Sequence, residues 1–113
     1  MIESYSFGRV VIDGKVYSSD VIIFPDRVKV GWWRREGHRL HIEDLNDVVA
    51  VKPEVLVVGT GYVGLMRVPD EVRVFLEEQG IKLIVERTRK ACEIFNDLLK
   101  SGKKVVAALH LTC

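Results

Sequence analysis

The first half of the chain alternates apolar and polar positions in the manner of β-strands. Residues 7–12 and 16–24 are rich in β-branched and aromatic side chains, and Asp13-Gly14 between them is a hairpin turn signal. Residues 28–33 then repeat with a period of two, which predicts a strand with one face on the core. A short helix that ends before Pro53 follows, and its apolar side consists of Ile42, Leu45, Val48 and Val49.

The second half predicts buried strands that alternate with helices. Three apolar runs, residues 55–58, 81–85 and 105–109, are typical of strands that are buried on both faces. Helices are predicted after Pro69 and from Thr88, whose hydroxyl can cap the helix that it opens. Strands joined through helices form right-handed parallel crossovers. We therefore expect a C-terminal βαβαβ unit of mutually parallel neighbours, and N-terminal strands that extend this sheet or cover one side of it.

Length, composition and charge point to an ordinary α/β domain in the cytoplasm. The 113 residues are enough for a single domain, residues 1–113, and the net charge of +1 argues against binding to nucleic acid. No apolar run approaches the roughly 20 residues that cross a bilayer, so no membrane insertion is expected. The first residues lack the basic start and apolar stretch of a secretory signal. Cys92 and Cys113 are expected to be free thiols, as in a reducing cytoplasm.

A glycine-rich motif follows the first of these buried strands and invites a dinucleotide interpretation. Residues 59–64 match G-x-G-x-x-G, and Glu86 stands where a ribose-binding acid is expected. The motif requires a helix directly after the glycines, whereas Pro69 delays the helix by about a turn. Asp70 and Glu71 in the first turn of that helix repel phosphate. We therefore expect no dinucleotide, and no other cofactor is indicated.

The same loop remains a candidate ligand pocket. Ligands of open α/β sheets bind at the carboxyl ends of the strands. Gly59, Thr60 and Gly61 lie at one such end and Thr88 follows the next parallel strand, so we expect them to be neighbours. Their amides and hydroxyls, with arginines nearby, fit a pocket for an anionic or polar ligand. The alternative is a purely structural glycine loop.

Two residues of the last helix carry a structural and a functional interpretation each. Cys92, in the first turns of the helix, is either a packed apolar residue or a thiol whose pKa the helix dipole lowers. Asn96 lies two turns beyond Thr88 and needs hydrogen-bond partners near the core. We expect Asn96 to line or brace the loop of residues 59–61. Its side chain either hydrogen-bonds the backbone of that loop or faces a ligand.

A candidate interface lies at Trp32, Trp33, Arg34 and Arg35. Alternation directs the two indoles to opposite faces, so that one enters the core and the other stays at the surface. An exposed tryptophan beside arginine is typical of protein interfaces, and a homodimer is one possible assembly. His38 and His41 lack a third ligand of suitable spacing, so no metal site is predicted. Nothing marks His110 as catalytic.

Over its whole length the chain resembles a small α/β domain family of unknown biochemical function. Eukaryotic members of that family include a mitochondrial respiratory-complex-I assembly factor and an adipogenesis-associated protein. The most specific matching features are the Gly59-Thr60-Gly61 turn and the helix Thr88-x-x-Ala91-Cys92-x-x-x-Asn96. Weaker matches are Tyr5-x-Phe7-Gly8, Gly14-x-x-Tyr17-x-x-Asp20, Trp33 with Gly37-His38, Glu43-Asp44-Leu45, Pro53-Glu54-Val55-Leu56, Gly80-Ile81 and Val105-Val106-Ala107-Ala108-Leu109. The resemblance implies a three-layer α/β fold with a mixed sheet, no established enzyme activity, and roles in assembly or protein interaction.

The residues themselves also favour a non-enzymatic binding or assembly-type protein with an unknown protein partner. The pattern brings together no paired carboxylates, no nucleophile with a base, and no metal cluster. No catalytic residue is therefore predicted. The alternative is a small-molecule-binding protein or an enzyme, with its pocket at the strand ends near Gly59, Thr60 and Gly61.

Overall fold

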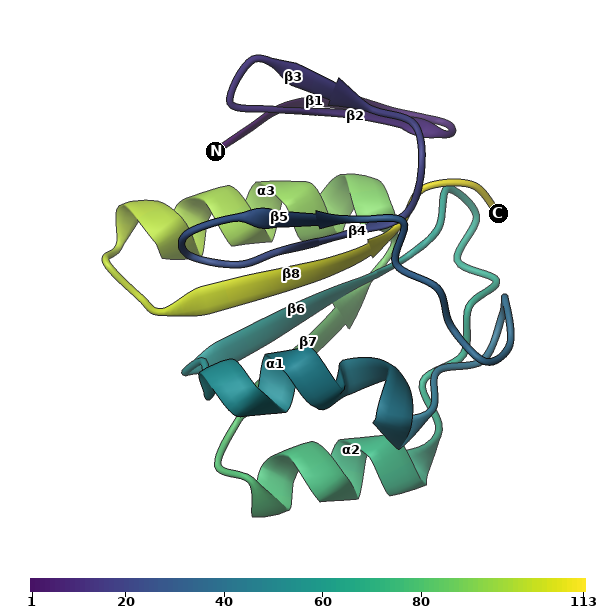
Figure 1. Ribbon diagram of the computed structural model, residues 1–113, viewed down its shortest axis with the longest axis vertical. Coiled ribbons are helices and arrows are strands. Elements are labelled where there is room, and N and C mark those ends of the chain that lie inside the picture. The colour runs from purple at the N-terminus through teal and green to yellow at the C-terminus, as the bar shows by residue number, and fades with distance from the viewer.

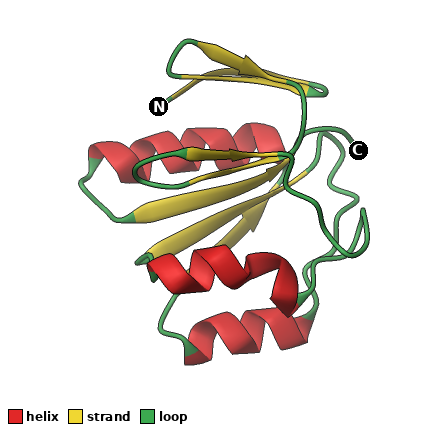
Figure 2. Ribbon diagram, viewed as in Figure 1, coloured by secondary structure: helices red, strands yellow, loops and turns green.

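The computed structural model describes residues 1–113 and arranges them as two β-sheets with three α-helices (Figures 1 and 2). The larger sheet has five strands in the order β5-β4-β8-β6-β7. The smaller sheet is antiparallel, with the order β1-β2-β3. The strands are β1 (Ile2–Ser6), β2 (Arg9–Ile12), β3 (Lys15–Tyr17), β4 (Val21–Ile23), β5 (Val28–Val30), β6 (Val55–Thr60), β7 (Lys82–Glu86) and β8 (Val105–His110). The helices are η1 (Ile42–Leu45, a 3-10 helix), α1 (Asn46–Val51), α2 (Asp70–Glu78) and α3 (Thr88–Lys100).

The predicted parallel unit is confirmed. β6 pairs in parallel with β7 on one side and with β8 on the other. Because β4 pairs antiparallel with both β8 and β5, the five-stranded sheet is mixed. Every residue of β6 and β8 is buried, as expected for strands that are covered on both faces.

Each face of the large sheet has its own hydrophobic core. One core joins β6 and β8 to Ala91, Cys92 and Phe95 of α3 and to the underside of the small sheet. The other core joins the opposite face to η1, α1 and α2, where Leu45 and Leu76 are fully buried. Figure 1 shows the resulting layers, with α3 beneath the small sheet and α1 and α2 beyond the opposite face of the large sheet. α3 is the longest helix at 13 residues, and neither it nor any other helix meets the requirement for a membrane span.

The N-terminal half departs from the sequence-based expectation in three places. The strand expected over residues 28–33 ends at Val30, and the Val30 side chain is exposed instead of facing the core. Residues 16–24 do not form one strand, because the chain leaves the small sheet after β3, and β4 belongs to the large sheet. The connection between β3 and β4 consists of the polar residues Ser18, Ser19 and Asp20. A further strand, β1, pairs with β2 through a turn in which Gly8 has a φ of +73°. The small sheet therefore covers the domain, whereas β4 and β5 complete the large sheet.

One edge of the large sheet gathers the irregular segments of the chain. β5, β6, β7 and β8 all run in the same direction, so the residues that follow them emerge together. We call this side, with loops 31–41 and 61–69 and residues 111–113, the carboxyl edge. Figure 1 shows both loops and the C-terminus there, on the right of the view.

Candidate functional site

The glycine loop is attached to α3 by a hydroxyl group, as predicted from the meeting of parallel strand ends. Thr88 Oγ1 accepts a hydrogen bond of 2.8 Å from the amide of Gly61 and donates one of 2.5 Å to the backbone oxygen of His110. Thr60 Oγ1 donates to the backbone oxygen of Glu86 at 3.2 Å. The prediction that Thr88 caps the helix is wrong. Its hydroxyl bonds Gly61 after β6 and His110 of β8, and the N-cap residue is Arg87.

Two of the glycines are required by close contacts and not by a nucleotide. A Cβ added to Gly59 would lie 2.8 Å from Thr88 Oγ1 and 3.1 Å from Thr88 Cα. Gly61 has a φ of +111°, and its Cβ would lie 2.3 Å from the carbonyl carbon of Cys113. α2 begins only at Asp70, which confirms the late helix start behind the rejected dinucleotide motif. That the chain binds no dinucleotide remains a prediction.

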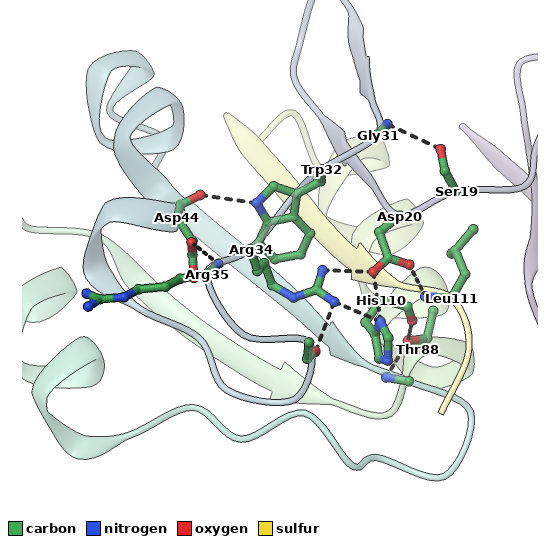
Figure 3. Close-up of polar contacts among 12 residues, drawn as sticks. Ser19, Asp20, Gly31, Trp32, Arg34, Arg35, Asp44, Thr88, His110 and Leu111 are labelled. Carbon is green, nitrogen blue, oxygen red and sulfur yellow. Dashed lines mark hydrogen bonds and ion pairs between the residues drawn. The ribbon is translucent and has the colours of Figure 1, made fainter.

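A buried polar cluster of Asp20, Arg34 and His110 lies next to this loop (Figure 3). Arg34 Nη1 is 2.8 Å from Asp20 Oδ2, and its side chain is only 5% exposed. Asp20 Oδ1 accepts from the amide of Leu111 at 2.8 Å. His110 Nδ1 is 2.8 Å from Asp20 Oδ2. The cluster thus joins the passage between the sheets, loop 31–41 and the end of β8.

The charge of Asp20 determines which imidazole nitrogen of His110 carries the proton. Burial acts to raise the pKa of Asp20, but hydrogen bonds from His110, Leu111 and Arg34 outweigh it and lower that pKa below its ordinary value. The ionised carboxylate therefore accepts from His110 Nδ1–H. Arg34 Nη2, 3.0 Å from the same nitrogen, donates instead to the oxygen of Gly37 at 3.0 Å. His110 Nε2 is buried and has no hydrogen-bond partner in the protein.

The cluster holds loop 31–41 in place around Trp33. The guanidinium of Arg34 lies over the Trp32 ring, 4.6 Å from its centroid. Trp32 is buried, and its Nε1 donates to the oxygen of Asp44 at 3.1 Å. Asp44 Oδ1 also accepts from the amide of Arg35 at 3.0 Å. Trp33 stands between these anchored residues with 90% of its surface exposed, so the expectation that the indoles separate is confirmed.

Two of the depressions at the carboxyl edge lie next to the predicted site residues. One, of about 310 Å³, lies between the Ser19–Asp20 passage and loop 31–41, and Trp32, Trp33 and Arg34 line it. The other, of about 690 Å³, lies beside the glycine loop, and we call it the arginine hollow. Its lining includes Arg39, Arg67, Arg73, Arg87, Thr60, Asp70 and Glu86. Of the six residues predicted to line or brace a pocket here, only Thr60 lines the hollow. The polar pocket predicted near residues 59–61 therefore stays a prediction.

The prediction that Asn96 braces the glycine loop is wrong. Asn96 Oδ1 accepts from the amide of Ile2 at 2.9 Å, and its Nδ2 donates to the oxygen of Ile2 at 2.8 Å. It therefore attaches β1 to α3 and makes no hydrogen bond to the glycine loop. Asn96 does hydrogen-bond backbone polar groups near the core. Those groups belong to β1, a strand that the sequence pattern did not predict.

Asn96→Ala is expected to destabilise the fold by about 1–3 kcal/mol, because both polar groups of Ile2 lose their side-chain partner. Denaturant unfolding measures the loss, and amide exchange should accelerate first in β1 and β2. Ser101→Ala is the control, since the Ser101 hydroxyl donates only to Asp97 within its own helix and is exposed. A loss no larger than that of the control would contradict the bracing role.

Cys92 belongs to the hydrophobic core. Burial raises the pKa of the Cys92 thiol to about 12, which outweighs the lowering effect of nearby Arg89. Of the two interpretations of Cys92, the packed apolar residue is therefore the right one, and its thiol is protonated at neutral pH. No disulfide joins Cys92 to Cys113, and no group of three His, Cys, Asp or Glu residues could hold a metal ion.

Under native conditions at about pH 7.5, we expect a thiol reagent to modify Cys113 and to spare Cys92, because the reactive thiolate is absent at the buried site. Cys92 should react only after denaturant unfolds the chain. Mass spectrometry of peptides from the treated protein checks both statements. Equal rates at the two cysteines in the folded protein would contradict the assignment of Cys92 to the core.

Sequence reasoning missed the polar cluster almost completely. Arg34 was expected at an interface, yet it is buried against Asp20, while His110 and Asp20 carried no assigned role. One signal was available, because Asp20 and His110 are polar residues at the ends of apolar strand segments. Such residues need partners when buried. The partner residues lie far apart in the sequence, so only the fold identifies them.

Comparison with known proteins gives consistent matches along the whole chain. A family described as "Protein of unknown function (DUF498/DUF598)" matches residues 2–110. "NADH dehydrogenase [ubiquinone] 1 alpha subcomplex assembly factor 3" of Xenopus tropicalis is 28% identical over 110 residues. That alignment covers 96% of this chain but only 59% of the frog protein. This chain therefore spans less than two thirds of the frog protein's length.

Solved structures share the fold. A conserved hypothetical protein from Pyrococcus horikoshii OT3 has a TM-score of 0.84 and 30% identity, over 100% of this chain and 99% of that one. An outer membrane protein from Bartonella henselae has a TM-score of 0.84 and 29% identity, over 99% of this chain and 94% of that one.

Proposed function

The chain belongs to the DUF498/DUF598 family of proteins of unknown function, and we propose that it is a non-enzymatic protein that binds a protein partner through its carboxyl edge. One observation supports this most directly. Trp33 is 90% exposed, although the residues on both sides of it are held in the core. A large indole on a loop that is already ordered loses little conformational entropy when it binds.

The surroundings of Trp33 fit a protein interface. Tryptophan and arginine are the residues most enriched among those that dominate binding energy. Arg35, the next residue but one, is exposed, and Trp33 itself lines the depression of about 310 Å³. The adjoining edge strand β5 exposes 59% of Val30 and extends the apolar surface. These features supply an aromatic anchor, a polar rim and a recess for a partner side chain.

An assembly role is the form of binding that we favour. The frog relative is named as an assembly factor, and that name supports an assembly role here. A homodimer through the β5 edge is one version of this proposal, because that strand has one unpaired side. Sedimentation at high micromolar concentration checks it, and a monomer there would remove it. We further propose that the protein acts in the cytoplasm, which the two free cysteines support, with no cofactor and no nucleic acid.

Trp33→Ala should strongly reduce recovery of the partner while leaving the fold intact. Affinity capture from native cell extract, quantified by mass spectrometry, compares the original chain with this variant. A residue of this kind contributes about 2 kcal/mol or more, so recovery should fall by roughly thirtyfold. Val74→Ala is the matched control, because Val74 is 52% exposed on α2, away from the carboxyl edge. Equal recovery with both variants, or repeated recovery of no partner, would count against the proposal.

The alternative function is binding of a small molecule at the strand ends. The arginine hollow is the specific observation that favours it. It does not compete with the first function, since no residue lines both depressions.

A further inference from the structure

The arginine hollow is built by three parts of the chain, because loop 61–69 runs directly into α2 and contributes two of its four arginines with it. Arg39 comes from loop 31–41, Arg67 from loop 61–69, Arg73 from α2 and Arg87 from the end of β7. The convergence is therefore a product of the fold and not of a local basic run. Figure 1 shows the two loops side by side where they cross at the carboxyl edge.

These four guanidinium groups have no carboxylate partner within 4 Å. By contrast, Arg27, Arg34 and Arg35 are each ion-paired elsewhere in the chain. Two carboxylates, Asp70 and Glu86, line the hollow without pairing, so a surplus of two positive charges remains. In a chain whose net charge is only +1, this local surplus is concentrated at one site.

The backbone holds two of the arginines next to each other. Arg39 and Arg67 are partners in an isolated parallel bridge. The amide of Leu40 donates to the oxygen of Arg67 at 2.9 Å, and the amide of Arg67 donates to the oxygen of His38 at 2.8 Å. Like charges on adjacent bridge partners are unfavourable by themselves. An anion between them removes the repulsion and replaces it with charge-assisted hydrogen bonds.

We propose that the arginine hollow binds a small phosphorylated hydroxy compound, such as a sugar phosphate. Guanidinium groups match phosphate oxygens with two parallel hydrogen bonds, which a single point charge does not. Asp70 and Glu86 would repel a bare polyanion but accept hydrogen bonds from hydroxyl groups next to the phosphate. A volume of about 690 Å³ lies in the normal range of small-molecule pockets.

This site differs from the rejected dinucleotide motif. Its phosphate rests on arginine side chains and not on the amides of a helix that follows the glycines directly. The hollow is also a single depression and not a basic stripe along the surface, which separates it from a nucleic-acid groove. The proposal does not depend on the protein-binding role of Trp33.

The test is an amide NMR titration of the full chain at constant ionic strength. The probes are ribose 5-phosphate, ribose, inorganic phosphate and a glutamate-rich peptide. We expect ribose 5-phosphate to give saturable shifts at Thr60, Gly64 and Arg67, inorganic phosphate to bind more weakly, and ribose to give none. Arg67→Gln should weaken binding by about tenfold or more. Arg9→Gln, on the small sheet and in no ion pair, is the matched control and should have no effect.

A second variant tests the hydroxyl contact. Glu86→Gln should reduce the preference for ribose 5-phosphate over inorganic phosphate, because a weaker amide acceptor replaces the carboxylate and a charge that repels phosphate disappears. The absence of saturable shifts with ribose 5-phosphate would overturn the proposal. Equal weakening by Arg9→Gln and Arg67→Gln, or tighter binding of the glutamate-rich peptide, would also overturn it, the last in favour of an acidic protein segment.

Discussion

Asp20→Ala should be among the most damaging single substitutions in this chain, with an expected loss of about 3–5 kcal/mol in the free energy of unfolding. The variant leaves the guanidinium of Arg34, only 5% exposed, without its counter-charge. It also deprives His110 Nδ1 and the amide of Leu111 of their acceptor. A domain of this size is commonly stable by only about 5–15 kcal/mol, so denaturant unfolding will show the loss clearly.

Two comparisons separate this effect from an ordinary lost ion pair. Asp47→Ala removes the exposed pair with Lys29 and should cost less than about 1 kcal/mol. Adding Arg34→Met to Asp20→Ala removes the uncompensated charge, so the double variant should be more stable than Asp20→Ala alone. Strictly additive losses from the two substitutions would show that Asp20 and Arg34 are not coupled.

The same carboxylate predicts how stability responds to acid. Because the pKa of Asp20 is lowered in the folded protein, its contribution is fully present above its unfolded value of 3.8 and is lost as the pH falls through the folded value. The stability difference between the original chain and Asp20→Asn should therefore be constant near neutral pH and shrink in acid below about pH 4. Unfolding curves measured across this pH range check the sign.

Gly61→Ala is expected to cost about 2–5 kcal/mol, from backbone strain and steric overlap together. The φ of +111° is unfavourable for any residue with a Cβ, and that Cβ would lie 2.5 Å from the carbonyl oxygen of Cys113. The C-terminal segment would have to move, and the amide of Tyr62 would lose its 2.6 Å bond to Thr112. Denaturant unfolding measures the loss of stability.

Gly80→Ala is the matched control, because Gly80 also has a positive φ, of +75°, but a Cβ there would meet nothing within 4 Å. Gly80→Ala should lose only the free energy that corresponds to backbone strain, about 1–2 kcal/mol. The difference between the two variants measures the close approach of residues 112–113 to the glycine loop. If both variants lose the same amount, the packing of the C-terminal segment on Gly61 contributes nothing.

The elements that the sequence predicted well are those specified by local signals. The apolar runs at 55–58, 81–85 and 105–109 became β6, β7 and β8, because a strand covered on both faces tolerates few polar residues. Pro69 and Gly80 bound α2 as expected. The contact between Thr88 and Gly61 was also predictable, since it follows from parallel strands ending at a common edge.

The errors concern relations between distant segments. The sequence at the end of β3 does not indicate that β4 joins another sheet, because apolar and polar positions alternate in the same way in strands of either sheet. Asn96 was assigned to the wrong backbone, since the strand over α3 is β1, which its own sequence marks weakly. Arg34 and His110 are 76 positions apart, and no pattern along the chain indicates that they meet. Burial of a charge is a property of the assembled layers and not of any local sequence.

The position of β8 governs the order in which the molecule can fold. It is the last of the eight strands along these residues, yet it lies between β4 and β6 at the centre of the large sheet. Until residues 105–110 are available, the β4–β5 hairpin and the β6–α2–β7 unit cannot join, and both present apolar strand edges to water. Pairings of such wide sequence separation are slow to form, and unpaired edges promote aggregation. We therefore expect a nascent chain of this domain to be prone to aggregation until residues 105–110 pair with β4 and β6.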